Sequence, residues 1–168
     1  MDDPKASDKW TTGAGRTILF EDILGILKNH SLRGGQISVG TDSFIRKGEC
    51  IFSTAICLYG ATNQMGGRYF IRRSKLKAST YKTLLQRILA EVQSSVELGT
   101  HLVEINPSLS IELHLDISDP SKNRATSKFA DMLVGYAKGA GFSYKVKPHA
   151  FAAASVADKH SKNMVADA

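Results

Sequence analysis

Four acidic residues, each on a different predicted element, are the strongest candidates for chemistry: Asp42, Glu91, Asp116 and Asp158. Asp42 and Asp116 close two predicted strands, which would bring both carboxylates to one edge of a sheet if those strands are parallel neighbours. Gathered at one point, four acids repel strongly unless cations hold them. Mg²⁺ and Mn²⁺ prefer oxygen ligands, and such a cluster suits phosphoryl transfer in which one ion activates water and another stabilises the leaving oxygen.

Each acid also has a simpler structural interpretation, which the residues alone leave open. These interpretations are a turn aspartate (Asp42), a helical partner for Arg87 (Glu91), an Asx turn toward Pro120 (Asp116) and a solvated helix residue (Asp158). None of them requires the four acids to meet. The metal hypothesis therefore depends on the elements that position them.

The hydrophobic pattern predicts five strands and several helices. The strands are expected at 36–43, 49–59, 68–73, 111–117 and 142–146. Two helices are expected at 79–98 and 121–140, and two more are expected to begin at residue 17 and near residue 150. The first three strands read as an antiparallel meander. We therefore expect an α/β fold with a five-stranded mixed sheet, flanked by helices and preceded by an extra N-terminal helix that Thr17 can cap.

One boundary, after residue 16, divides the chain into two parts. Residues 1–16 are polar and are predicted to form a flexible N-terminal arm, in which Trp10 is the one residue that could dock. Residues 17–168 contain no linker or repeat and are predicted to form one domain.

The helical phase of 79–98 decides which of its acids can face the sheet. Its apolar arc is predicted to comprise Leu84, Leu85, Ile88, Leu89, Val92 and Val96. At about 100° per residue, Glu91 falls on the edge of this arc, while Glu97 faces solvent. Ser95 lies on the Glu91 side and is small enough for close approach to a strand. Glu91 is therefore the inward acid.

Composition narrows the class of protein. The 168 residues are 42% hydrophobic and 23% charged, with a net charge of +6 and a pI near 9.4. No apolar run approaches the roughly 20 residues that a membrane span needs. Cys50 and Cys57 lack metal-ligand spacing and read as small buried hydrophobes in a reducing compartment. We expect a cytoplasmic protein with no membrane contact.

Basic residues suggest a polyanionic partner. The candidates for contacts to nucleic acid are Arg68, Arg72, Arg73, Lys75 and Lys147, with Tyr69, Phe70 and Tyr81 interleaved among the first four or close behind them. Phosphate contacts from such residues would provide affinity without sequence specificity. A solvated charged face is the alternative.

Several motifs resemble one known family. The segments ISVGTDS (37–43), GGRYFIRR (66–73), HLDI (114–117), KPHA (147–150) and VADK (156–159) are similar to the YkuK-like family of predicted ribonuclease H-like nucleases. The resemblance runs from about residue 17 to the C-terminus and implies a metal site of Asp42, Glu91, Asp116 and Asp158. The sequence departs from some cellular ribonucleases H in having no basic insertion of the kind that grips RNA–DNA hybrids, so specificity for hybrids is not assumed. His149 is a catalytic aid or a surface-loop histidine, and His114 a buried donor or plain core.

These observations predict a Mg²⁺- or Mn²⁺-dependent phosphodiesterase that acts on nucleic acid. The first alternative is a non-catalytic nucleic-acid-binding domain of the same fold. The second is an actin-like ATPase, which needs a second matching domain and phosphate-binding glycine loops that a chain of 168 residues has no room for. Substrate type (RNA, DNA, hybrid or junction) and oligomeric state stay open.

Overall fold

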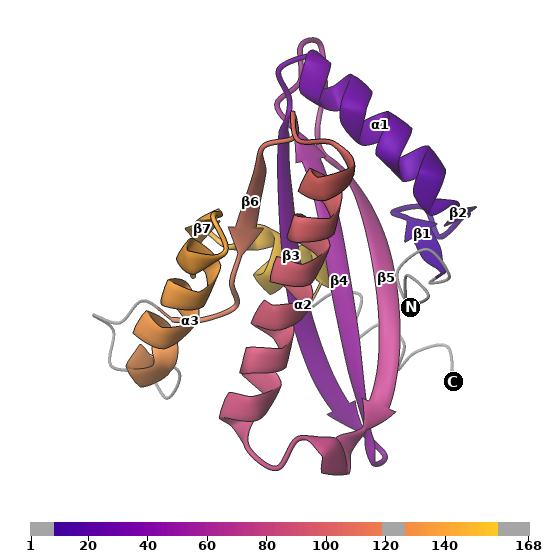
Figure 1. The fold of residues 1–168 in the computed structure, drawn as a ribbon. Helices are drawn as coiled ribbons and strands as arrows, with labels where there is room; N and C mark the ends of the chain where they lie inside the picture. Colours follow the sequence, from indigo (N-terminus) through magenta and orange to yellow (C-terminus); the bar gives the residue numbers. More distant parts are fainter. Residues whose placement is uncertain (1–8, 119–126, 158–168) are drawn as a thin grey trace.

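The structure is a computed structural model and describes residues 9–118 and 127–157. These residues form one sheet in the order β2-β1-β5-β4-β3-β6-β7, with helices on both faces (Figure 1). The strands are β1 (Trp10–Thr12), β2 (Thr17–Ile18), β3 (Gln36–Arg46), β4 (Glu49–Tyr59), β5 (Arg68–Lys77), β6 (Ile111–His114) and β7 (Ser143–Lys145). The helices are α1 (Phe20–Leu32), α2 (Leu84–Ile105) and α3 (Ser127–Gly139), with a 3₁₀ turn η1 (Ala78–Thr80) and a π-helical segment η3 (Ala152–Ala157).

The mixed sheet flanked by helices confirms the predicted fold class, although its described residues contain seven strands instead of five. Strands β3, β4 and β5 form the predicted antiparallel meander. Strand β6 runs parallel to β3, and β7 runs parallel to β6. The two further strands, β1 and β2, extend the β5 edge.

Residues 10–16 were predicted as part of a flexible arm in which Trp10 could dock, and Trp10 does dock, in the strand β1. Trp10 is fully buried, stacks on Phe20 with ring centroids 5.9 Å apart, and lies in a strand paired with β5. Thr17, the predicted helix cap, lies in β2 instead, and α1 begins at Phe20 without a side-chain cap. Burial of a large aromatic ring stabilises this pairing more than chain entropy opposes it.

The long hairpin of β3 and β4 extends beyond the predicted end of the first strand. Lys47 and Gly48 both have positive φ, as a two-residue hairpin turn with the right-handed strand twist requires. The turn lets pairing continue to Arg46 opposite Glu49. Strand β5 is likewise longer than predicted, because its ladder with β4 continues to Lys77.

Helix α2 starts later and ends later than the predicted 79–98. The side chain of Thr83 accepts a hydrogen bond from the Gln86 backbone, and the Gln86 side chain accepts one from the Thr83 backbone, which forms a capping box. Leu84 and Leu89 are exposed, so the buried arc is narrower than the apolar pattern suggests. Its centre, Ile88 to Leu102, packs on the sheet.

The C-terminal elements are shorter than predicted. Strand β6 ends at His114, so Asp116 lies in the segment that follows the strand. Within the described residues, α3 covers the second part of the predicted helix 121–140; the span 119–126 lies outside them. Strand β7 is three residues long, and the predicted alanine-rich helix takes the form of η3.

Two hydrophobic clusters show what covers each face. The larger cluster joins α1, α2 and α3 to one face through side chains such as Val39, Phe70 and Leu113. The smaller joins η3 to the other face through Ala55, Cys57 and Ile71 with Ala152 and Ala157. In Figure 1, α2 lies along the front of β3 and β4, and the yellow η3 segment lies behind them. No helix of the described residues is long and apolar enough to span a membrane.

Candidate functional site

The sheet opens where β3 and β6 separate. Their parallel ladder ends with the pair Gly40 and His114, whereas β3 continues to Arg46 beside β4 alone. Asp42 and Asp116 each lie two residues beyond that last pair. Both acids therefore stand at the carboxyl side of neighbouring parallel strands, where open α/β sheets place ligands.

Helix α2 is held against β3 by polar contacts one helical turn apart. The hydroxyl oxygens of Ser95 and Thr41 are 2.8 Å apart, and the Glu91 carboxylate accepts hydrogen bonds from the Ser43 backbone N–H (3.0 Å) and hydroxyl (2.5 Å). One turn of helix rises about 6 Å, close to the roughly 6.7 Å that two strand residues span. The two contacts are therefore in register.

Glu91 reaches the open edge because β6 no longer pairs there. The ladder between β3 and β6 ends at Gly40, three residues before Ser43, so the backbone N–H of Ser43 has no partner in β6 and donates to Glu91 instead. Glu91 is 6% exposed, whereas Glu97 faces solvent and takes a hydrogen bond from Gln93. This confirms the predicted phase of the helix and the close approach of Ser95 to a strand. The hydrogen bonds of the Glu91 carboxylate come from Ser43, whereas Arg87, the partner considered from the sequence, acts on Glu91 through its charge and lowers its pKa.

The charges of Asp42 and Asp116 both act on Glu91. Burial raises the pKa of Glu91 to about 8; the hydrogen bond from Ser43 opposes this rise, and the charges of Asp42 and Asp116 add to it. By strand alternation, Asp42 projects to the face opposite Thr41 and Ser43. The acids thus approach from the two faces of the sheet and become neighbours where it opens.

Asp116 lies against Lys147, a residue that the sequence analysis predicted to contact nucleic acid. The ammonium of Lys147 lies 2.8 Å from Oδ1 of Asp116. That oxygen is buried, and no donor within the described residues forms a well-aligned hydrogen bond with it. Lys147 was predicted to contact nucleic acid; here it supplies a positive charge to the acidic cluster.

Asp42, Glu91 and Asp116 all carry carboxylates, and carboxylate oxygens are the ligands that hard divalent cations prefer. Among the described residues, no three His, Cys, Asp or Glu side chains are yet arranged to hold a metal. The crevice between Thr41, Glu91 and Asp116 is too narrow for a water molecule. Asp158, the fourth predicted ligand, lies outside the described residues. Coordination would require the Glu91–Ser43 and Asp116–Lys147 contacts to rearrange.

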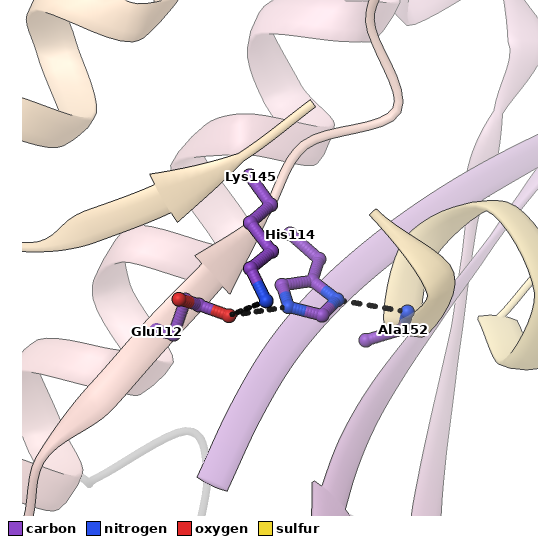
Figure 2. Close-up of polar contacts among 4 residues, drawn as sticks. All are labelled: Glu112, His114, Lys145 and Ala152. Atoms are coloured by element: carbon purple, nitrogen blue, oxygen red, sulfur yellow. Dashed lines mark hydrogen bonds and ion pairs between the residues drawn. The ribbon is translucent and has the colours of Figure 1, made fainter. Parts of the chain in front are cut away.

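His114 joins β6 to η3 (Figure 2). Its Nε2 lies 2.9 Å from Oε1 of Glu112, and its Nδ1 accepts a hydrogen bond from the backbone N–H of Ala152 at 3.1 Å. Burial lowers the pKa of His114, which favours the neutral ring with one donor and one acceptor. Lys145 holds the same Glu112 oxygen at 3.3 Å. His114 is thus buried, donates to Glu112 and anchors η3 as an acceptor, while His149 is exposed in the loop after β7.

The predicted nucleic-acid-binding residues of β5 divide between the two faces. Phe70 packs in the larger cluster and Ile71 in the smaller one. By the same alternation, Arg68 and Arg72 share the α1 face, where their guanidinium groups lie over the rings of Phe70 and Trp10. Arg73 and Lys75 share the opposite face. The predicted set is therefore two groups, as the alternation of side chains along one strand requires.

Arg73 belongs to the group on the face of Asp42. Asp42 pairs with Ser53, and Ser53 pairs with Arg73, so the three residues form one row across adjacent strands. Two interstrand spacings separate the Asp42 and Arg73 backbones by roughly 10 Å. Burial lowers the pKa of Arg73. On the described geometry, Arg73 and Asp42 share a face of the sheet.

A three-strand meander joined to parallel strands, with acids where the parallel pair separates, defines an α/β domain with a site at the opening of its sheet. A sequence model of the family described as "Ribonuclease H-like" matches residues 19–162 of this chain. The chain belongs to the ribonuclease H-like family. Searches of curated proteins and of solved structures found no match.

Proposed function

We propose that this protein is a divalent-metal-dependent nuclease that hydrolyses phosphodiester bonds with Asp42, Glu91 and Asp116, completed by Asp158, and that it belongs to the YkuK-like branch of its family. The observation that carries the proposal is the convergence of Asp42 and Asp116 on Glu91, whose pKa both acids raise. Three acids brought together on separate elements have a high electrostatic cost, which a cation removes.

Each described acid has a distinct part in this proposal. Asp42 and Asp116 supply carboxylate oxygens from adjacent strands, and Glu91 supplies one from the helix above Ser43. Bound Mg²⁺ or Mn²⁺ would polarise the phosphodiester and favour attack by water. Lys147, next to Asp116, can hold a phosphate oxygen once a cation takes its place at the carboxylate.

The second candidate, a domain that binds nucleic acid without cleaving it, also has an observation in its favour. The Lys147 ammonium already neutralises Asp116, which gives the acid a structural role without metal. In that case the protein would retain nucleic-acid affinity in EDTA and show no turnover. The reducing cytoplasm is the compartment we propose, because Cys50 and Cys57 are buried free thiols.

The decisive experiment incubates the purified chain with end-labelled single-stranded RNA, single-stranded DNA, duplexes and RNA–DNA hybrid, with Mg²⁺, Mn²⁺ or EDTA. We expect cleavage of at least one substrate with Mn²⁺ or Mg²⁺ and none with EDTA. Binding without cleavage in all conditions would support the non-catalytic candidate. Cleavage that persists in EDTA would exclude the metal-dependent mechanism.

Arg73 and Arg72 form a matched pair for testing where nucleic acid binds. We expect Arg73→Ala to weaken affinity by about three- to tenfold for all sequences alike and to reduce the salt dependence of binding, since Arg73 shares a face with Asp42. Arg72→Ala, on the other face over Trp10, should change affinity by less than about twofold. Equilibrium binding by fluorescence anisotropy at several salt concentrations measures both. Equal losses in the two variants would contradict this assignment.

A further inference from the structure

A second pocket lies away from the acids, between the end of α1 and the β4–β5 connection. It has a volume of about 320 Å³. Its apolar wall is formed by Ile26 and Leu58. Its polar groups come from His30, Gln64, Arg33 and Arg68. That volume is at the small end of the range for pockets that hold small organic ligands.

Several wall groups are held in place by hydrogen bonds to the backbone. The Gln64 side chain accepts from the N–H of Ala61 and donates to the carbonyl of Leu58. His30 is 7% exposed, and its Nε2 lies 2.9 Å from the carbonyl oxygen of Gln36. A Cβ at Gly35 would lie 2.2 Å from that ring nitrogen, so only glycine permits this packing. The wall is therefore preorganised.

Two arginines bring positive charge to the pocket without an acidic partner. Arg33 donates from Nη2 to the carbonyl of Thr62, and Arg68 lies 5.1 Å above the Phe70 ring. No Asp or Glu lines the pocket, and neither guanidinium forms an ion pair within the described residues. Among the residues that the structure describes, the pocket therefore has two guanidinium groups and no carboxylate.

We propose that this pocket binds a small phosphate monoester, with its phosphate between Arg33 and Arg68 and its organic part against Ile26 and Leu58. A single carboxylate satisfies one guanidinium fork, whereas a phosphate monoester has nearly two negative charges and three acceptor oxygens. It therefore matches two arginines better. The C-terminal end of α1 opposes an anion, but backbone N–H groups of Arg33, Gly34 and Gly35 already satisfy its last carbonyls.

The pocket is separate from the acidic cluster. Leu58 lies five residues along β4 from Ser53, the residue paired with Asp42, which is roughly 17 Å of strand. Arg68 is on the sheet face opposite Arg73. Ligand binding here consequently needs no divalent metal, and it can be tested in EDTA independently of nuclease activity.

The test is calorimetric titration of the full chain, in EDTA, with adenosine monophosphate and with adenosine. We expect the phosphorylated compound to bind at least about tenfold more tightly. Arg68→Gln should reduce that affinity by about tenfold, and Arg33→Gln likewise, whereas Arg72→Gln on the same strand should leave it within about twofold. Circular dichroism establishes that each variant folds, and Arg68→Lys, which keeps the charge but loses the fork, should have intermediate affinity.

A short oligonucleotide with and without a terminal phosphate distinguishes the source of the ligand. Arg68-dependent preference for the phosphorylated oligonucleotide, without binding of adenosine monophosphate, would assign the pocket to the end of a nucleic-acid strand and overturn the proposal of a small ligand. If neither phosphorylated probe binds better than its phosphate-free counterpart, or Arg68→Gln binds as wild type does, the proposal is overturned.

Discussion

Asp42→Asn is expected to abolish metal-dependent cleavage, with a loss of at least about a hundredfold in turnover, because it removes a carboxylate at the opening of the sheet. The same substitution removes one of the charges that raise the pKa of Glu91. We therefore expect the metal-free variant to be at least as stable as wild type near neutral pH. Cleavage assays and thermal melts with and without Mn²⁺ measure the two effects.

The melts also test the cation directly. Wild type should gain stability from Mn²⁺ by about 2.7 kcal/mol at a hundredfold excess over the dissociation constant, whereas Asp42→Asn should gain none. Glu97→Gln is the matched control, since Glu97 is an exposed acid on the same helix as Glu91. It should behave as wild type in both assays. An equal Mn²⁺-induced rise in the Asp42→Asn melting temperature would show that Asp42 is not a central ligand.

Glu91→Gln is expected to make stability less sensitive to pH. Burial raises the folded-state pKa of Glu91 from 4.5 to about 8, so the folded protein holds this proton more tightly than the unfolded chain. Its contribution is fully present below about pH 4.5 and is lost as pH rises through about 8. The loss is on the order of 4 kcal/mol, and glutamine, which mimics the protonated acid and still accepts from Ser43, avoids it.

Thermal melts without metal at about pH 5 and pH 8.5 measure this difference. At the lower pH the two proteins should melt at similar temperatures; at the higher pH the variant should melt about 10 °C above wild type. Glu97→Gln again serves as the control, with no pH-dependent difference expected. A wild type that loses no more stability than Glu91→Gln between the two pH values would mean that Glu91 ionises normally.

The local pattern of apolar and polar residues correctly predicted the features that depend on residues close together in the chain. The β-branched run before Asp42 predicted a strand, and the 100° periodicity after Thr83 predicted which side of α2 faces the sheet. Glu91 inward, Glu97 outward and Ser95 against a strand followed from that phase alone. The predicted ends of β3 and α2 were less accurate. The Lys47–Gly48 turn sets the end of β3 and the Thr83 capping box sets the start of α2, and each depends on one or two residues that a periodic pattern does not weigh.

Pairing between distant strands decided the rest. Trp10 was a candidate for docking, but its docking by strand pairing depended on the β5 edge being free to accept β1, which the pattern around residue 10 does not reveal. The pairing of Lys147 with Asp116 follows from the parallel register of His114 with Lys145, two residues earlier in each segment. Register is a property of two strands together, so neither segment contains it.

By itself, the sequence determined the α/β class, the central meander and the inward direction of Glu91, because strand alternation and helical phase are set within one segment. Only the tertiary structure decided that β6 ends early enough to open the sheet beside Asp42, and which helices cover the face of Arg68 and the face of Arg73. It also decided how far the pKa of Glu91 rises, since that shift comes from burial by distant elements and from the charges of Asp42 and Asp116. Desolvation and Coulomb interactions depend on distance in space, and the order of residues does not state that distance.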